Sequence, residues 1–328
     1  MSAAPRPSAR LSIGGLAALV VIACQAPGVT ASRAQPDDEV LARARAYVAG
    51  YERAFVDLLS EERSTQELRE PGALSSVPSS PRAMPGGPPL MDAPGSSDRT
   101  TRRRLRANYL IVRAATGLGW VPFRDVVEVD GRAVGERERR LGELLSGDGP
   151  ADLSRARRLM VEGARHDLGD VARTFNIPVL GLLFAHPDRA AHASFARGRV
   201  ERVGGRRAVV YEFAEQGQPT LVRGPGDQDV PSTGRLWVDE ATGAVLKTEH
   251  RVQAWDVAAT VTVEYRHDER LQMWLPERMD EEYRWSGQAR VLRVSARYAD
   301  YHRLQVQASE SEPAVPRKPP GGAPPGRS

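Results

Sequence analysis

Apolar and polar residues alternate over short stretches in the second half of the chain, and turn sequences separate these stretches. Alternation with a period of two is typical of β-strands that bury one face. The turn 239–243 closes the clearest hairpin, with Gly243 where a left-handed backbone is favoured. The predicted strands are 104–112, 123–129, 200–203, 209–213, 234–238, 244–252, 257–265, 271–275, 279–285 and 289–301. This order predicts an antiparallel sheet with one apolar and one charged face.

The apolar face supplies part of a candidate ligand site. In the strand 244–252, Leu246 and Val252 alternate with charged residues, so we expect both on the apolar, concave face of the sheet. Met279 and Trp285 are expected on the same face. Glu281 lies between them in the alternation, and we expect this carboxylate at the rim of the sheet.

Three segments have helical patterns. Residues 37–59 form an amphipathic stripe, and 151–168 read as a second helix that follows a proline. Residues 176–185 are almost wholly apolar, and a helix that is apolar on every side must be buried. We therefore expect 176–185 to cover the concave side of the sheet as a lid, with Leu180, Leu183 and Phe184 against a ligand.

Composition divides the chain. Pro, Gly and Ser dominate residues 71–100 and 309–328, which cannot bury enough apolar surface to fold and are expected to be disordered. The predicted organisation is a signal peptide at 1–31, a helix with a first strand at 32–70, the disordered loop 71–100, a β domain at 101–308 with a helical insertion at 150–187, and a disordered tail at 309–328.

The first 31 residues have the pattern of an export signal: two arginines, an uncharged apolar run and small residues near Ala31. The apolar run is shorter than the roughly 20 residues that cross a bilayer as a helix. Cys24 leaves two interpretations open. It is either one small residue of a cleaved signal or the lipidated cysteine of a lipobox, which would be the chain's one membrane anchor. The expected location is the periplasm or cell envelope.

Charge and motifs narrow the function. The chain has 46 basic and 42 acidic residues, a balance that exerts no long-range attraction on nucleic acid. It contains no phosphate loop, dinucleotide-binding turn, nucleophile elbow or zinc-protease motif. We therefore assign no catalytic residue, no metal ligand and no cofactor. His250 falls on the apolar face of its strand and is expected to be a core histidine.

Two stretches carry a resemblance to a known family. The hairpin 236–246, with Asp239, Thr242 and Gly243, is similar to one common in the LolA/LolB superfamily, and 298–304 resembles that superfamily's last strand. Residues 119–134 and 173–178 resemble segments of exported bacterial proteins of uncharacterised function. The resemblance implies an α+β, mostly β fold: a curved, unclosed antiparallel sheet with an N-terminal helix and an inserted helical lid, whose concavity holds lipid-like chains.

Three functions remain open at this stage. The first is a non-enzymatic envelope protein that binds a lipid, an acyl chain or a lipoprotein anchor in the half-barrel. The second is an envelope scaffold or assembly protein that binds a protein partner through its surface. The third is a hydrolase whose catalytic residues the sequence does not reveal.

Overall fold

The computed structural model describes residues 38–55, 58–72, 98–113, 120–135, 161–169, 176–224 and 228–303, together with 16–17, 158 and 171–172. The predicted leader lies outside these ranges except for residues 16–17, and so does Cys24. Most of the predicted loop 71–100 and the whole tail 309–328 also lie outside them. Of the predicted helix 151–168, residues 158 and 161–168 are described; 158 and 161–164 are helical, whereas 165–168 are not.

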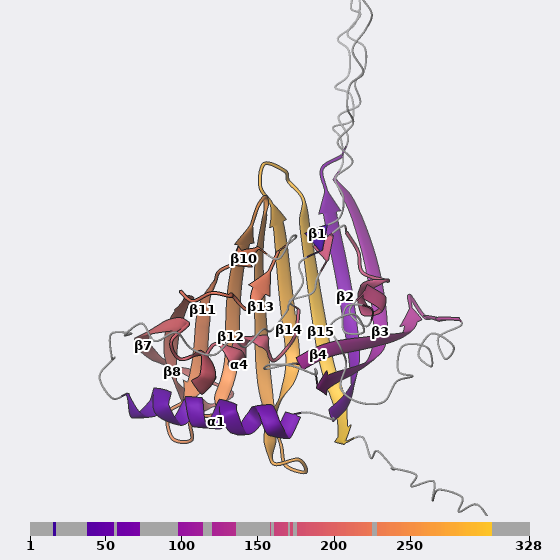
Figure 1. Ribbon diagram of the computed structural model, residues 1–328. Coiled ribbons are helices and arrows are strands. Elements are labelled where there is room, and N and C mark those ends of the chain that lie inside the picture. The colour runs from indigo at the N-terminus through magenta and orange to yellow at the C-terminus, as the bar shows by residue number, and fades with distance from the viewer. Residues whose placement is uncertain are drawn as a thin grey trace, which may run out of the picture.

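An 11-stranded antiparallel sheet forms the body of the protein (Figure 1). In spatial order its strands are β5 (Arg132–Ala133), β4 (Trp120–Val129), β3 (Arg99–Arg113), β2 (Leu58–Glu70), β15 (Val291–Arg303), β14 (Met273–Trp285), β13 (Val257–Asp268), β12 (Val245–Ala254), β11 (Ser232–Asp239), β8 (Arg206–Glu215) and β7 (Ala193–Val203). Within the described chain, the edge strands β5 and β7 do not pair with each other, so the sheet is unclosed. The predicted fold class, a mostly β protein with a curved antiparallel half-barrel, is confirmed.

Short elements accompany the sheet. They are α1 (Glu39–Phe55), α4 (Leu180–Leu183), the 3₁₀ helix η1 (Pro187–Arg189), a parallel pair of β1 (Leu16–Ala17) with β6 (Val171–Ala172), and the hairpin of β9 (Val222–Arg223) with β10 (Asp229–Val230). Helix α1 runs across the strands near one end of the sheet, and it contacts β11 and η1 (Figure 1). We call the face that carries α1 and α4 the covered face and the opposite, charged face the open face.

Helix α1 is shorter than the predicted 37–59. It begins after Asp38, whose Oδ1 accepts hydrogen bonds from the backbone N–H groups of Val40 (3.1 Å) and Leu41 (3.3 Å). It ends at Phe55, and Leu58 already pairs with β15. The apolar pattern in the sequence continues past the end of α1 because Leu58 is buried as a residue of β2, just as it would be in a longer helix.

The predicted helix 176–185 is largely a buried turn structure. Every residue from Ile177 to Ala185 is buried, but regular helix is confined to α4. Val179 precedes α4 and has no side-chain oxygen to cap it, and the flanking backbone bonds are of the i to i+3 type, as from Ala185 N–H to Leu182 O. The predicted burial is thus confirmed, and the predicted length is wrong.

The tight turns of the sheet follow the sequence. Gly204 and Gly205 join β7 to β8 with φ of 56° and 81°, a two-residue turn that needs left-handed backbone at both positions. Between β11 and β12 the pairing is irregular at Trp237 and Val238, which face Lys247 and Val245 respectively. The extra residue on β12 is Leu246, and a bulge of this kind redirects the side chains around it.

Candidate functional site

Residues 176–190, which we call the cover segment, lie on the covered face over β8, β12 and β13. The Phe184 ring stacks on Phe213 of β8 with ring centroids 4.3 Å apart. A Cβ added to Gly181 would lie 2.8 Å from the Cβ of Thr248, so α4 packs directly on β12. The Tyr265 hydroxyl donates a hydrogen bond of 2.7 Å to the carbonyl of Pro178. The cover segment thus fills this part of the half-barrel.

Six of the seven predicted ligand-site residues belong to one continuous apolar cluster on the covered face. They are Leu180, Leu183, Phe184, Val252, Met279 and Trp285, and each is buried. Phe184 contacts rings of β8 and β12, whereas Met279 lies by Tyr298 of β15. The predicted residues therefore share a face but line different parts of it.

Leu246 is the exception, and the expectation that it lies with Val252 is wrong. It packs in a separate small cluster with Val210 and Trp237. The bulge on β12 is the reason, since one extra residue reverses the alternation of side chains. Nothing in the composition of 244–252 marks that bulge.

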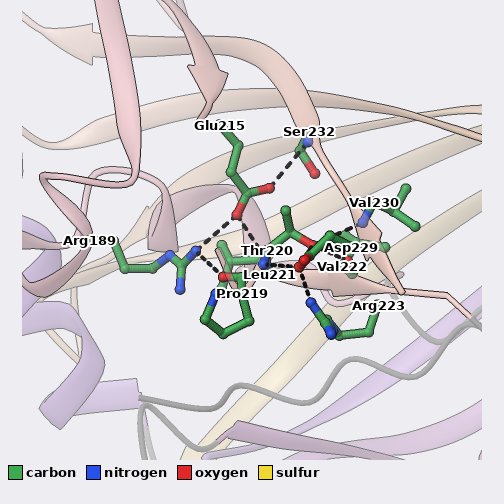
Figure 2. A network of polar contacts seen from close by, with 10 residues as sticks. All are labelled: Arg189, Glu215, Pro219, Thr220, Leu221, Val222, Arg223, Asp229, Val230 and Ser232. Atoms are coloured by element: carbon green, nitrogen blue, oxygen red, sulfur yellow. Dashed lines mark hydrogen bonds and ion pairs between the residues drawn. The ribbon is translucent and has the colours of Figure 1, made fainter. Parts of the chain in front are cut away.

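A buried carboxylate anchors the end of the cover segment (Figure 2). Glu215, at the end of β8, accepts hydrogen bonds from Arg189 (2.9 Å), from Leu221 N–H (2.8 Å) and from Ser232 N–H (3.2 Å). Burial raises the pKa of Glu215 above its ordinary value, against the lowering effect of these donors. The ion pair with Arg189 joins η1 to the sheet, so the cover segment is held at this end by a polar contact.

The β9–β10 hairpin extends the same network (Figure 2). Asp229 accepts hydrogen bonds from the backbone N–H (2.7 Å) and the hydroxyl (3.1 Å) of Thr220, and it pairs with Arg223. The Thr220 hydroxyl also accepts from Val230 N–H at 2.9 Å. These contacts fix the hairpin beside the residues that hold Glu215.

Helix α1 closes the covered face from another side. Asp38 accepts hydrogen bonds from Arg197 (2.8 Å) and from the Tyr211 hydroxyl (2.7 Å), which tie the helix start to β7 and β8. Burial raises the pKa of Asp38, but these donors outweigh it and hold the pKa below its usual value. At the other end of α1, Glu52 lies 3.2 Å from His186 of the cover segment.

The other half of the covered face, over β2, β3 and β4, contains a buried pair of charged residues. Arg124 of β4 donates to Glu62 of β2 at 2.7 Å, with side chains only 8% and 2% exposed. The Arg124 guanidinium also lies 5.6 Å from the ring of Tyr109, which meets Tyr298 edge to face. The two opposite charges of this buried pair compensate each other.

Residues 161–169 pack on this polar half. Gln66 donates to Asp167 at 2.7 Å and accepts from Leu168 N–H at 2.6 Å. Gly163 lies so close to Arg124 that an added Cβ would come within 3.3 Å of its backbone. The segment therefore covers the Arg124 end of the half-barrel.

Several buried polar atoms on the covered face have no hydrogen-bond partner. They are the hydroxyls of Tyr47 and Tyr51 on α1, the hydroxyl of Tyr109 on β3 and one carboxylate oxygen of Glu62 on β2. Burial raises the pKa of Tyr51 well above its ordinary value, with further contributions from neighbouring tyrosines, so its hydroxyl stays a donor at neutral pH. Because almost all buried polar groups in folded proteins are bonded, such atoms commonly meet a ligand or a water.

Glu281 is not at the rim, contrary to expectation. It is 2% exposed, and it accepts a hydrogen bond from the Tyr283 hydroxyl two residues along β14.

The burial of Glu62, Arg124 and Glu215 was not predicted from the sequence. In β2 both faces carry polar residues, so the alternation that identifies a buried face in β13 is absent there. The recurrence of tyrosine on α1, β3, β13 and β15 is the one feature of the sequence that could have indicated buried polar groups on this face.

The described residues contain no group of three or more His, Cys, Asp or Glu side chains arranged to hold a metal ion. In the same part of the chain, no helix has both the length and the hydropathy needed to span a bilayer. His250 is a buried core histidine, as expected, and burial lowers its pKa to about 4.

No protein-family model matches the chain, and no curated protein matches it in sequence. Similar solved structures exist. A putative outer membrane lipoprotein-sorting protein domain from Vibrio parahaemolyticus has a TM-score of 0.33 and 12% identity, with 80% of this chain and 93% of that one covered. A LolA superfamily protein from Nitrosomonas europaea has a TM-score of 0.32 and 12% identity, with coverage of 83% and 96%.

A DUF1329 family protein from Desulfovibrio piger has a TM-score of 0.29 and 10% identity, with 82% and 95% covered. These similarities concern the fold alone. The function proposed below is argued from this chain's own residues.

Proposed function

We propose that this protein is a non-enzymatic envelope protein that binds a lipid or acyl chain, such as a lipoprotein anchor, on the covered face of its half-barrel. The observation that carries the proposal is a buried apolar surface on this face that adjoins buried polar groups without a hydrogen-bond partner. A ligand with a long apolar chain and a small polar end combines the same two features. The export signal remains a prediction, and lipidation of Cys24 remains one of two open interpretations of that signal; both fit an envelope location.

The apolar half suits the chain of such a ligand. Val252, Phe213 and Phe184 belong to one buried apolar cluster that continues to Met279 and Trp285. Each buried CH₂ group contributes about 0.8 kcal/mol, so an acyl chain that replaces the cover segment would regain much of the burial lost when the segment leaves. The cover segment and the ligand chain are thus competitors for one surface.

The polar half suits an uncharged polar end. The Tyr109 hydroxyl can donate a hydrogen bond, and the carboxylate oxygen of Glu62 that has no partner can accept one. Because Glu62 and Arg124 already neutralise each other, a charged group there would be buried without a counter-ion, which is costly. Hydroxyl and ester groups would satisfy these atoms without adding charge.

The cover segment has to move for a ligand to enter. Its apolar centre packs on the sheet, and its η1 end is held through Arg189 and Glu215. Local opening of a segment costs less than global unfolding when its contacts are separable from the rest of the core. A four-residue helix without a side-chain cap has little stability of its own, which favours such opening.

The test locks the cover segment with a disulfide between Gly181→Cys and Thr248→Cys. A Cβ added to Gly181 would lie 2.8 Å from the Cβ of Thr248, so the two positions have to move apart by about 1 Å to reach the usual disulfide spacing of about 3.8 Å. The folded protein, with a serine at Cys24, is titrated with a fluorescent fatty acid. We expect uptake by the reduced double variant and at least about tenfold weaker uptake by the oxidised one. The single Gly181→Cys variant is the control for the substitution itself.

Equal uptake in both redox states would contradict binding beneath the cover segment. A reduced protein that binds no fatty acid, diacylglycerol or lipopeptide would overturn the proposal. The scaffold function would then be favoured, and a protein partner that binds equally to the locked and unlocked forms would support it.

A further inference from the structure

The open face carries an unusual row of like charges. Arg106, Arg63, Arg297 and Arg278 pair directly across β3, β2, β15 and β14. Adjacent strands are about 4.8 Å apart, so these residues lie along a line of about 15 Å. Side chains of directly paired residues lie on the same face, and like charges placed opposite each other destabilise a sheet. Such a row therefore has a cost in stability.

A neighbouring row on the same strands avoids that cost. Arg102, Glu67, Arg293 and Glu282 alternate in charge across β3, β2, β15 and β14. Arg102 meets Glu67 at 2.8 Å, and Arg293 meets Glu282 at 2.8 Å. The two rows are four residues apart along each strand, so local composition alone does not account for the difference.

Acidic neighbours neutralise part of the arginine row. Arg63 pairs with Glu61, Arg106 with Glu128 at 2.9 Å, and Arg278 with Asp280 at 2.7 Å. Arg297 is exposed and has no ion-pair partner among the described residues, and the same holds for the guanidinium of Arg104. Two guanidinium groups without an ion-pair partner thus remain on the open face: Arg297 within the arginine row and Arg104 beside it.

A shallow open groove of about 570 Å³ lies over these two arginines. Its lining includes Arg104 and Arg297, the hydroxyl residues Thr65 and Ser295, and Glu128, whose carboxylate pairs with Arg106. Arg104, Thr65 and Ser295 are themselves paired across β3, β2 and β15. The groove therefore combines cationic forks with two neutral hydroxyl donors.

We propose that this groove binds a phosphate group through Arg104 and Arg297, with Thr65 and Ser295 as additional donors. Guanidinium groups match the oxygen geometry of phosphate and bind it with charge-assisted hydrogen bonds. The tetrahedral group also has enough oxygens to accept from both hydroxyls at once. The phosphate can be free in solution or belong to a phospholipid headgroup, and the chemistry of the site is the same for both.

The test compares charge-matched variants of the full chain with a serine at Cys24. Arg297→Gln and Arg104→Gln remove the unpaired guanidinium groups. Arg293→Gln removes one positive charge from the same face of β15 but from a paired arginine. One arm titrates inorganic phosphate by calorimetry at low salt. The other measures co-sedimentation with vesicles of phosphatidylglycerol and with vesicles of phosphatidylcholine.

We expect saturable binding in at least one arm, weakened roughly tenfold or more by Arg297→Gln and Arg104→Gln and changed less than about twofold by Arg293→Gln. Binding of phosphate identifies a soluble ligand, and binding of phosphatidylglycerol vesicles alone identifies a lipid headgroup. If all three variants weakened binding equally, the effect would come from the net charge of the face, and the proposed phosphate site would be wrong. Absence of binding in both arms would overturn it as well. None of these outcomes depends on the ligand beneath the cover segment.

Discussion

The two halves of the covered face are built on the same sheet and packed in opposite ways. Over β8, β12 and β13 the contacts are mainly apolar, and they include the stack of Phe184 of the cover segment on Phe213 of β8. Over β2, β3 and β4 the sheet itself supplies a buried ion pair between Glu62 and Arg124. Apolar contacts are non-directional, so contacts with a ligand can replace them. Loss of either partner of a buried charge pair leaves the other charge buried and uncompensated, which is strongly destabilising. The comparison predicts that the contacts of one half can be replaced by those of a ligand and that the contacts of the other half cannot.

The largest expected effect tests the half with the buried ion pair. Glu62→Gln should lower the free energy of unfolding by about 3–5 kcal/mol, because it leaves Arg124 buried without its counter-ion. Urea denaturation of the purified protein measures this. Glu67→Gln is the matched control on the same strand, since Glu67 faces the open side in partly exposed pairs with Arg102 and Arg69 and should cost about 1 kcal/mol or less. Similar losses in both variants would remove the distinction between the halves.

The next effect is a dependence of the folding stability on pH, which we attribute to His250 in the apolar half. Burial lowers the pKa of His250 from 6.5 to about 4, so the unfolded chain takes up the proton first as the pH falls. The stability that His250 contributes is complete above pH 6.5 and is lost between pH 6.5 and about 4, to a total of about 3 kcal/mol. Denaturation curves at pH 7 and pH 5 measure the loss, and His250→Gln should flatten it. An unchanged slope in that variant would refute the assignment to His250.

Phe184→Ala tests whether the apolar half is replaceable. Truncation of a phenylalanine in a permanent core costs about 3–5 kcal/mol. We expect no more than about 2 kcal/mol here, because the cover segment can open without global unfolding, and the opening free energy limits the loss. Phe123→Ala in β4, where the ring is also fully buried, is the comparison and should show the full core-sized loss. Equal losses would mean that the cover segment is permanent core.

The smallest effects compare two tyrosine hydroxyls. Tyr265→Phe should cost about 1 kcal/mol, because it removes the hydrogen bond to Pro178 of the cover segment. Tyr109→Phe should be neutral or slightly stabilising in the ligand-free protein, because its hydroxyl is buried without a partner. The same variant should bind a hydroxyl-bearing lipid more weakly than wild type. A loss of stability in Tyr109→Phe without ligand would indicate that ordered water occupies the site.

The sequence by itself determined the secondary structure wherever one face of a strand is apolar and the other charged. The alternation in 257–265 and the glycines at 204–205 predict strands and turns that the structure has, because these signals are local. The buried, apolar character of 176–185 is determined in the same way, since ten consecutive residues with almost no polar group cannot face water.

Only the tertiary structure decided which residues meet. Glu62 and Arg124 are 62 positions apart, and their pairing depends on β2 and β4 both flanking β3. Glu215 meets Arg189 only because the chain after η1 returns through β7 and β8. The arginine row has the same origin, since its members come from four strands whose register aligns them. Periodicity along the chain records which face a residue occupies, whereas long-range strand pairing, which has no local signal, sets its neighbours.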